Sequence, residues 1–256
     1  MLTDRGTGTS QTSPGGRSSF IDCGGESAGF LKAYETFQYA FFLISKLGAE
    51  MSQPAKVYVV IYTVYHHVHK LAVEVQKGLE STGVSAKMFQ VQETLPENVL
   101  KAIKAPPKPD LPIIKPEQLT EADGIIFGFP TSLLDATGAQ FAKGALNGKF
   151  AGTFFSTGSQ HGGQETTALT TIPYFVHQGM TYVPLGYPPA LSDSLNNIQE
   201  IVGGSAYGAG AIAAGDGSRD VTEKELAVAH YQGKNFGEII RAYVKGRDAF
   251  KTGEKN

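Results

Sequence analysis

The sequence predicts an α/β fold in which helices cover both faces of a doubly wound, five-stranded parallel sheet. Short apolar runs of strand length recur along the chain, and stretches with helical spacing of apolar residues lie between them. The strand runs are continuously apolar, which is typical of strands buried on both faces of a parallel sheet. With 256 residues and 41% hydrophobic content, the chain can bury one large core.

The clearest strand is the first one, Val57–Tyr62, which is rich in β-branched and aromatic residues. Its character changes at Thr63, where hydroxyl and imidazole side chains follow, and a helical pattern then covers Val68–Glu80. A strand that ends in a polar turn and continues as a helix presents unpaired N–H groups and the positive end of the helix dipole. We therefore expect the turn from Thr63 to Val68 to hold a phosphate group.

The remaining elements follow the same alternation of strand and helix. The last element is expected to be a helix whose start is a capping box formed by Thr222 and Glu225. In chain order we expect a strand at 84–91, a proline-rich connection at 93–116 around a short helix at 97–104, a strand at 124–129, a partly helical stretch at 133–149, a strand at 150–155, a helix at 164–178, a short strand at 181–184, glycine-rich loops at 186–217 and a helix at 221–244.

Three predicted strand ends carry loops rich in hydroxyl groups and glycine: Thr63–Val68, Pro130–Leu133 and Ser156–Gly163. In the flavodoxin-like strand order 2-1-3-4-5, these ends meet at one edge of the sheet, where open α/β sheets bind their ligands. This convergence predicts a nucleotide or flavin site.

The ends of the chain are expected to lie outside the domain. Residues 1–50 are predicted to be a disordered extension containing a short amphipathic helix within Phe30–Gly48, since the first thirty residues are rich in Gly, Ser and Thr. An appended surface helix is favoured there over a membrane-surface or partner-binding helix. Met51 precedes the first strand, so residues 51–246 are expected to form the domain and 247–256 a flexible tail.

Composition excludes several classes of function. The 22 basic and 24 acidic residues are nearly balanced and form no basic block, which argues against a nucleic-acid partner. The single cysteine, Cys23, excludes an intramolecular disulfide and fits a reducing, cytoplasmic compartment. No apolar run has membrane-spanning length.

Other motifs that could carry chemistry are weak. No Walker loop or nucleophile elbow is present, and the histidines at 66, 67 and 69 lack a further ligand at metal-binding spacing, so no metal is expected. The segment Gly208–Ala213 matches GxGxxA, but it follows no predicted strand and is interpreted as a glycine-rich surface segment. His177 ends a predicted helix, where it can either cap the helix or reach over a cofactor.

Several blocks together resemble one family, the WrbA-like NAD(P)H:quinone oxidoreductases in their fungal form. The resemblance covers residues 55–245 and implies a flavodoxin-like fold, bound FMN, a homotetramer or dimer, and two-electron transfer from NAD(P)H to quinones in detoxification and protection against oxidative stress. The blocks are TVYHHV, PPKPD, FGFPT, GALNGKFAGTFFSTGSQHGGQETTAL, HQGMTYVPLGY, GGSAYGAG and GDGSR.

The resemblance also implies roles for individual residues. The turn after the first strand would bind the FMN phosphate, the segment after the third strand would face the flavin, and the loop after the fourth would run along the isoalloxazine edge. Tyr65 would help to position the nicotinamide nucleotide, His177 would lie over the reacting ring as the catalytic residue, and Phe141 would stand near the substrate in place of a family tryptophan. The implied cofactor-binding residues are Thr63, Val64, Tyr65, His66, His67, Val68, Thr131, Ser132, Ser156, Thr157, Gly158, Ser159, Gln160 and His161.

The chain departs from the family in two places. His66 stands where the family usually has glycine, a position that permits positive φ. The loop after Pro130-Thr131 is shortened and lacks the family's arginine and Gly-Asn. An alternative interpretation is therefore a weakened, non-catalytic binding or scaffold protein, and a one-electron flavodoxin-type carrier is a third. The choice between NADH and NADPH stays open.

Overall fold

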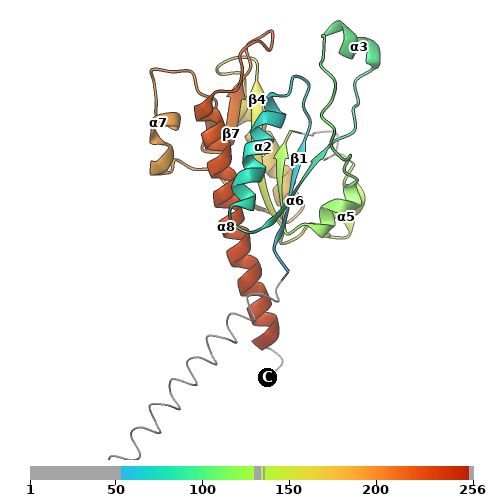
Figure 1. Cartoon of the computed structure of the whole chain (residues 1–256). Coiled ribbons are helices and arrows are strands. Elements are labelled where there is room, and N and C mark those ends of the chain that lie inside the picture. The colour runs from blue at the N-terminus through green and yellow to red at the C-terminus, as the bar shows by residue number, and fades with distance from the viewer. Residues whose placement is uncertain (1–52, 130–133, 135, 254–256) are drawn as a thin grey trace, which may run out of the picture. The chain divides into compact units, whose positions relative to one another are not determined.

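The computed structural model describes residues 53–129, 134 and 136–253, and these belong to one compact unit. Parallel strands pair in the order β2-β1-β3-β4, as the sequence predicts (Figure 1). The strands are β1 (Lys56–Ile61), β2 (Ser85–Gln90), β3 (Gly124–Gly128) and β4 (Phe150–Thr157). The predicted extension at 1–50, with its amphipathic helix, lies outside the described residues.

Two short strands share the fifth position of the sheet, beside β4. β5 (Thr181–Tyr182) pairs with the start of β4, and β7 (Gly208–Ile212) pairs with its end. β6 (Gly204–Ser205) adds an antiparallel edge to β7. The flavodoxin-like order 2-1-3-4-5 is thus confirmed, with its last position divided between two segments.

The prediction that Gly208–Ala213 is a surface segment was wrong, because every residue of β7 is buried. A Cβ atom on Gly208 would lie 1.9 Å from the carbonyl oxygen of Thr153 in β4. Only glycine permits this approach, so small residues are what allow the strand to enter the sheet. The same small residues remove the β-branched signal by which strands are recognised in a sequence.

Helices cover both faces of the sheet, as expected for a doubly wound fold (Figure 1). α2 (His67–Glu80) and α8 (Glu223–Gly253) pack with one cluster of buried side chains, and α6 (Gln164–His177) contributes to the other. The smaller helices are α3 (Glu97–Ala102), η1 (Pro116–Glu121), α5 (Gly138–Ala142), η2 (Pro189–Leu191) and α7 (Ser192–Leu195).

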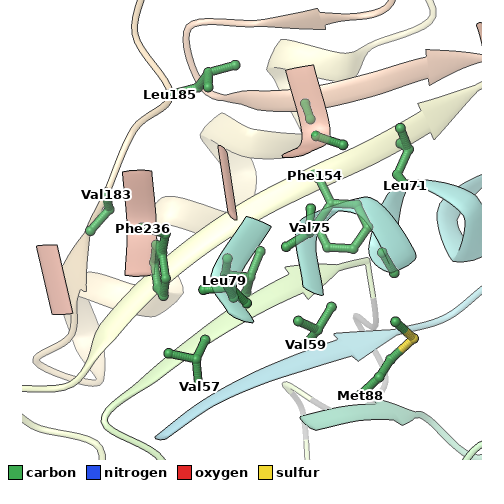
Figure 2. Packing of buried hydrophobic residues seen from close by; sticks show 14 of the residues in the cluster. Val57, Val59, Leu71, Val75, Leu79, Met88, Phe154, Val183, Leu185 and Phe236 are labelled. Atoms are coloured by element: carbon green, nitrogen blue, oxygen red, sulfur yellow. The ribbon is translucent and has the colours of Figure 1, made fainter. Parts of the chain in front are cut away.

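β1 divides its apolar side chains between the two clusters. Val57, Val59 and Ile61 join the cluster with α2 and α8, whereas Tyr58 and Val60 join the other cluster. Figure 2 shows Val57 and Val59 among Leu79, Val75 and Phe236. Burial on both faces explains why the strand is apolar without a break.

The two helices on one face approach each other closely. A Cβ on Gly78 of α2 would lie 2.1 Å from the carbonyl oxygen of His230, and one on Gly233 of α8 would lie 2.0 Å from that of Val75. Glycine at both positions therefore lets the two helix backbones touch. This contact fixes α2, and with it the turn that precedes α2, against the long C-terminal helix.

The start of α8 confirms the predicted capping box: Glu225 N–H donates to Thr222 Oγ1 at 3.3 Å, and Thr222 N–H donates to Glu225 Oε2 at 2.8 Å. The flexible tail predicted from residue 247 was wrong as far as Gly253, because α8 continues to that residue. Arg247 anchors this part of the helix by donating to Asp123 Oδ1 at 2.9 Å. Within the described residues, no helix is both long and apolar enough to cross a membrane.

Candidate functional site

The carboxyl ends of four strands surround a crevice of about 490 Å³. It contains the two predicted strand ends that can be compared in the structure, those after β1 and β4, so Thr63 and Ser156 share one site. The predicted contacts Thr131 and Ser132 lie outside the described residues. The crevice is lined by Tyr62, Thr63, Val64, Tyr65, His67, Val68, Phe129, Phe155, Ser156, Thr157, Gly158, Thr167, Ala213, Ala214, Gly215 and Gly217.

The turn between β1 and α2 offers a row of unused hydrogen-bond donors. Among the described residues, no acceptor is found for the backbone N–H groups from Thr63 to His69; the first bond of the helix runs from Lys70 N–H to His66 O at 2.9 Å. The Thr63 side chain is buried at this turn, and its hydroxyl has no hydrogen-bond partner in the described part of the chain. Such a group of free amides at a helix start is suited to binding an anion.

Strained backbone gathers around the crevice. His66 has φ of 67°, Phe129 of 33° and Ala214 of 66°, all in the region that side chains disfavour. These residues follow β1, β3 and β7 in turn, so each marks a strand end at the crevice. His66 thus adopts the positive φ that glycine, usual in the family at this position, permits. Strain of this kind concentrates at functional sites, where the surrounding structure holds it in place.

The loop after β4 divides between two cavities. Ser156, Thr157 and Gly158 line the crevice, whereas Ser159, Gln160 and His161 line a neighbouring cavity of about 420 Å³ together with side chains such as Glu165 and Glu200. Gln164 links the loop to β6, since its Nε2 donates to Thr157 Oγ1 at 3.1 Å and its Oε1 accepts from Gly204 N–H at 2.7 Å. Only the first half of the predicted segment therefore faces the crevice.

Two predicted residues lie away from the crevice of their own chain. α6 begins beside the end of β4 and runs back along the sheet, so His177 at its C-terminus lies at the opposite edge, next to the start of β5. The structure therefore does not bring His177 to the crevice of its own chain, and its role over the reacting ring stays a prediction. Phe141 lies in α5 with 54% of its surface exposed and is absent from the crevice lining.

A charged cluster behind the turn was missed by the sequence analysis. Lys108 Nζ lies 2.6 Å from Glu93 Oε2 and donates to Thr63 O at 2.5 Å, and Tyr62 Oη donates to Glu93 Oε1 at 2.8 Å. Burial alone would raise the pKa of Glu93, but hydrogen bonds from Lys108, the Leu95 amide and Tyr62 lower it to about 2. Burial, followed by the hydrogen bond to Glu93, raises the pKa of Tyr62 to about 12. Glu93 is thus ionised and Lys108 is held in place.

The segment after β7 was also missed as part of the site, although the GDGSR block at 215–219 could have pointed to it. His67 Nε2 lies 2.8 Å from the carbonyl oxygen of Arg219, which ties this segment to the first turn of α2. Arg219 pairs in turn with Glu225 at 3.0 Å, and the fully buried Glu225 carboxylate accepts hydrogen bonds from the Gly203 and Ile212 amides. Within the described residues, no group of His, Cys, Asp or Glu side chains could hold a metal ion.

Comparison with known proteins gives close relatives over most of the chain. NAD(P)H quinone oxidoreductase PST2 of Candida albicans is 46% identical over 204 residues, which cover 75% of this chain and 99% of the relative. Quinone-oxidoreductase QR2 of Triphysaria versicolor is 51% identical over 197 residues, covering 73% and 95%. No family model matches the chain. Among solved structures, a flavodoxin described as WrbA-like from Agrobacterium tumefaciens has a TM-score of 0.49 at 20% identity and covers 73% of this chain and 98% of that one.

Proposed function

Because the chain belongs to the WrbA-like NAD(P)H:quinone oxidoreductase family, we propose that it is an FMN-dependent enzyme that reduces quinones with NAD(P)H. The observation that carries this proposal is the turn Thr63–His69, whose amides have no acceptor within the described part of the chain and which lies in a crevice at the carboxyl edge of the sheet.

The chemistry of the crevice fits FMN. The free amides and the Thr63 hydroxyl suit a phosphate dianion, because backbone N–H groups at a helix start bind anions strongly. Phe129, Phe155 and Val68 provide apolar walls suited to an aromatic ring. The volume of about 490 Å³ lies in the range of small-molecule sites.

In this function the protein holds the reactants and orders the site. The Thr63–His69 turn would hold the phosphate, and Ser156–Gly158 would border the ring, with Thr131 and Ser132 as further proposed contacts. Tyr65, 40% exposed at the crevice, would meet the nicotinamide nucleotide. Bound FMN would supply the two-electron redox chemistry between NAD(P)H and the quinone. No acid–base pair is therefore required of the chain.

The proposal is tested by purifying the protein, recording its visible spectrum, and following NADH- and NADPH-dependent reduction of benzoquinone. We expect a flavin spectrum and hydroquinone formation without a semiquinone radical. A colourless protein that also fails to bind added FMN would favour the binding or scaffold protein, and release of semiquinone would favour the one-electron carrier. If the protein does not bind FMN, but a variant with the shortened loop restored to the family's length does, the site has decayed.

We further propose a homo-oligomer, dimer or tetramer, located in the cytoplasm. Large apolar side chains exposed on α5 and α6, namely Phe141, Leu169 and Val176, support a contact between copies, and the single cysteine supports a reducing compartment. Light scattering of the purified protein tests the assembly. Mass spectrometry of the native N-terminus tests whether residues 1–50 belong to the mature protein.

A further inference from the structure

The connection from Glu93 to Lys108 is attached to the anion-binding turn at three points. It leaves the end of β2, forms α3 and returns along the turn between β1 and α2. Two of the contacts are made by side chains of the turn and one by a side chain of the connection. The contacts are Tyr65 Oη to Ile103 O at 2.8 Å, His66 Nε2 to Pro107 O at 2.8 Å, and Lys108 Nζ to Thr63 O at 2.5 Å.

The contact from Lys108 differs from the others because it reaches the backbone of the turn. Lys108 does not line the crevice, whereas Thr63 and Val64 do. The peptide between Thr63 and Val64 is planar and trans, so its C=O and N–H point in opposite directions. Lys108, which does not line the crevice, holds the C=O, so the Val64 N–H of the same peptide points away from Lys108. No acceptor for that N–H is found among the described residues.

We propose that Lys108 is a positioning residue for the flavin phosphate: by holding the Thr63 carbonyl, it keeps the Val64 N–H aimed into the anion site. This role rests on the proposed function, since it concerns the same crevice. Lys108 acts through the peptide and does not itself touch the phosphate.

Glu93 keeps Lys108 in this role. Its Oε2 lies 2.6 Å from Lys108 Nζ, while its Oε1 accepts hydrogen bonds from Tyr62 Oη and from the Thr94 and Leu95 amides, each at 2.8 Å. The Lys108 ammonium also lies 4.3 Å from the centre of the Tyr62 ring. The carboxylate neutralises the charge of Lys108, so a long-range attraction between Lys108 and a phosphate is largely cancelled. What remains is the local hydrogen bond to the Thr63 carbonyl.

Two flavins that differ only in the phosphate test this role. We would prepare flavin-free wild-type protein and the variants Lys108→Met and Lys108→Arg, and measure the Kd of FMN and of riboflavin by flavin fluorescence. Lys101→Met is the matched control, since it removes an exposed lysine of the same connection that pairs with Glu97 instead of the turn. The Kd of FMN is expected to rise about tenfold in Lys108→Met. This is the effect of losing one charge-assisted hydrogen bond, the one from the Val64 N–H to the phosphate. Riboflavin affinity should stay unchanged, Lys108→Arg should restore most of the FMN affinity, and Lys101→Met should bind both flavins like wild type.

The outcomes separate this role from the proposed function. Wild-type protein that binds neither flavin overturns both. Wild-type protein that binds FMN overturns the role of Lys108 alone if Lys108→Met binds FMN equally well, or loses FMN and riboflavin affinity to the same degree. A loss of FMN affinity in Lys108→Met that disappears at high salt would show long-range attraction and would also overturn it. If Lys108→Met melts well below wild type, the double variant Glu93→Gln/Lys108→Met replaces it, because this variant has no unpaired carboxylate. The Kd values of FMN and riboflavin for the double variant then decide.

Discussion

His67 Nε2 lies 2.8 Å from the carbonyl oxygen of Arg219, and this bond joins the first turn of α2 to the segment that follows β7. The two segments are far apart in the chain, yet both line the crevice. The Arg219 side chain extends the connection to Glu225 at the start of α8. Two walls of the crevice, the start of α2 and the segment after β7, are therefore joined by one hydrogen-bonded network.

Arg219→Met should destabilise the protein strongly. It leaves the fully buried Glu225 carboxylate without its cation, a loss that costs about 3 kcal/mol or more in comparable buried pairs. Urea unfolding measures the change. Lys224→Met is the control, because its pair with Glu200 is solvent-exposed and should contribute less than about 1 kcal/mol. Equal effects of the two variants would contradict the importance of the buried pair.

Gly233→Ala should destabilise the contact between α2 and α8. The added Cβ would lie 2.0 Å from the Val75 carbonyl oxygen, and overpacking of this kind costs about 1–3 kcal/mol. Gly246→Ala on the same helix is the matched control, since its Cβ would meet nothing within 4 Å and alanine favours helix by up to about 1 kcal/mol. The two substitutions should thus shift the thermal midpoint in opposite directions.

The positive φ of His66 can be tested by comparing glycine with alanine. Both His66→Gly and His66→Ala lose the imidazole, but only alanine keeps the strain of a Cβ at φ of 67°. The glycine variant should be more stable by about 1 kcal/mol. At Lys70, inside α2, the same pair of substitutions should show the reverse order. The same order at both positions would contradict the left-handed conformation of His66.

Acid should weaken the cluster behind the turn. The pKa of Glu93 falls from 4.5 to about 2 on folding, so Glu93 contributes stability above pH 4.5 that is lost as the pH falls toward about 2. Urea unfolding at about pH 5 and about pH 3 should show a smaller loss in Glu93→Gln than in wild type. Glu97→Gln, which changes an exposed carboxylate, should behave like wild type. An equal loss in all three proteins would exclude this contribution from Glu93.

Local sequence was sufficient for much of the fold and part of the site. Continuous apolar runs indicate strands buried on both faces, and a polar turn between such a strand and a helix predicts an anion site. The turn Thr63–Val68, whose residues line the crevice, was predicted in this way. The capping box at Thr222 and Glu225 is equally local, because its partners lie three residues apart.

Only the tertiary structure decided which distant residues share the crevice. β7 was not predicted from the sequence, because the glycines and alanines that permit its close approach to β4 have no strand propensity. The distance of His177 from the crevice of its own chain was not foreseen, because it depends on the direction in which α6 runs across the sheet. The contacts of Lys108 and Glu93 with the turn depend on the path of the proline-rich connection, which folds back along the turn. Periodicity and capping act between chain neighbours, whereas such contacts depend on where the backbone travels in three dimensions.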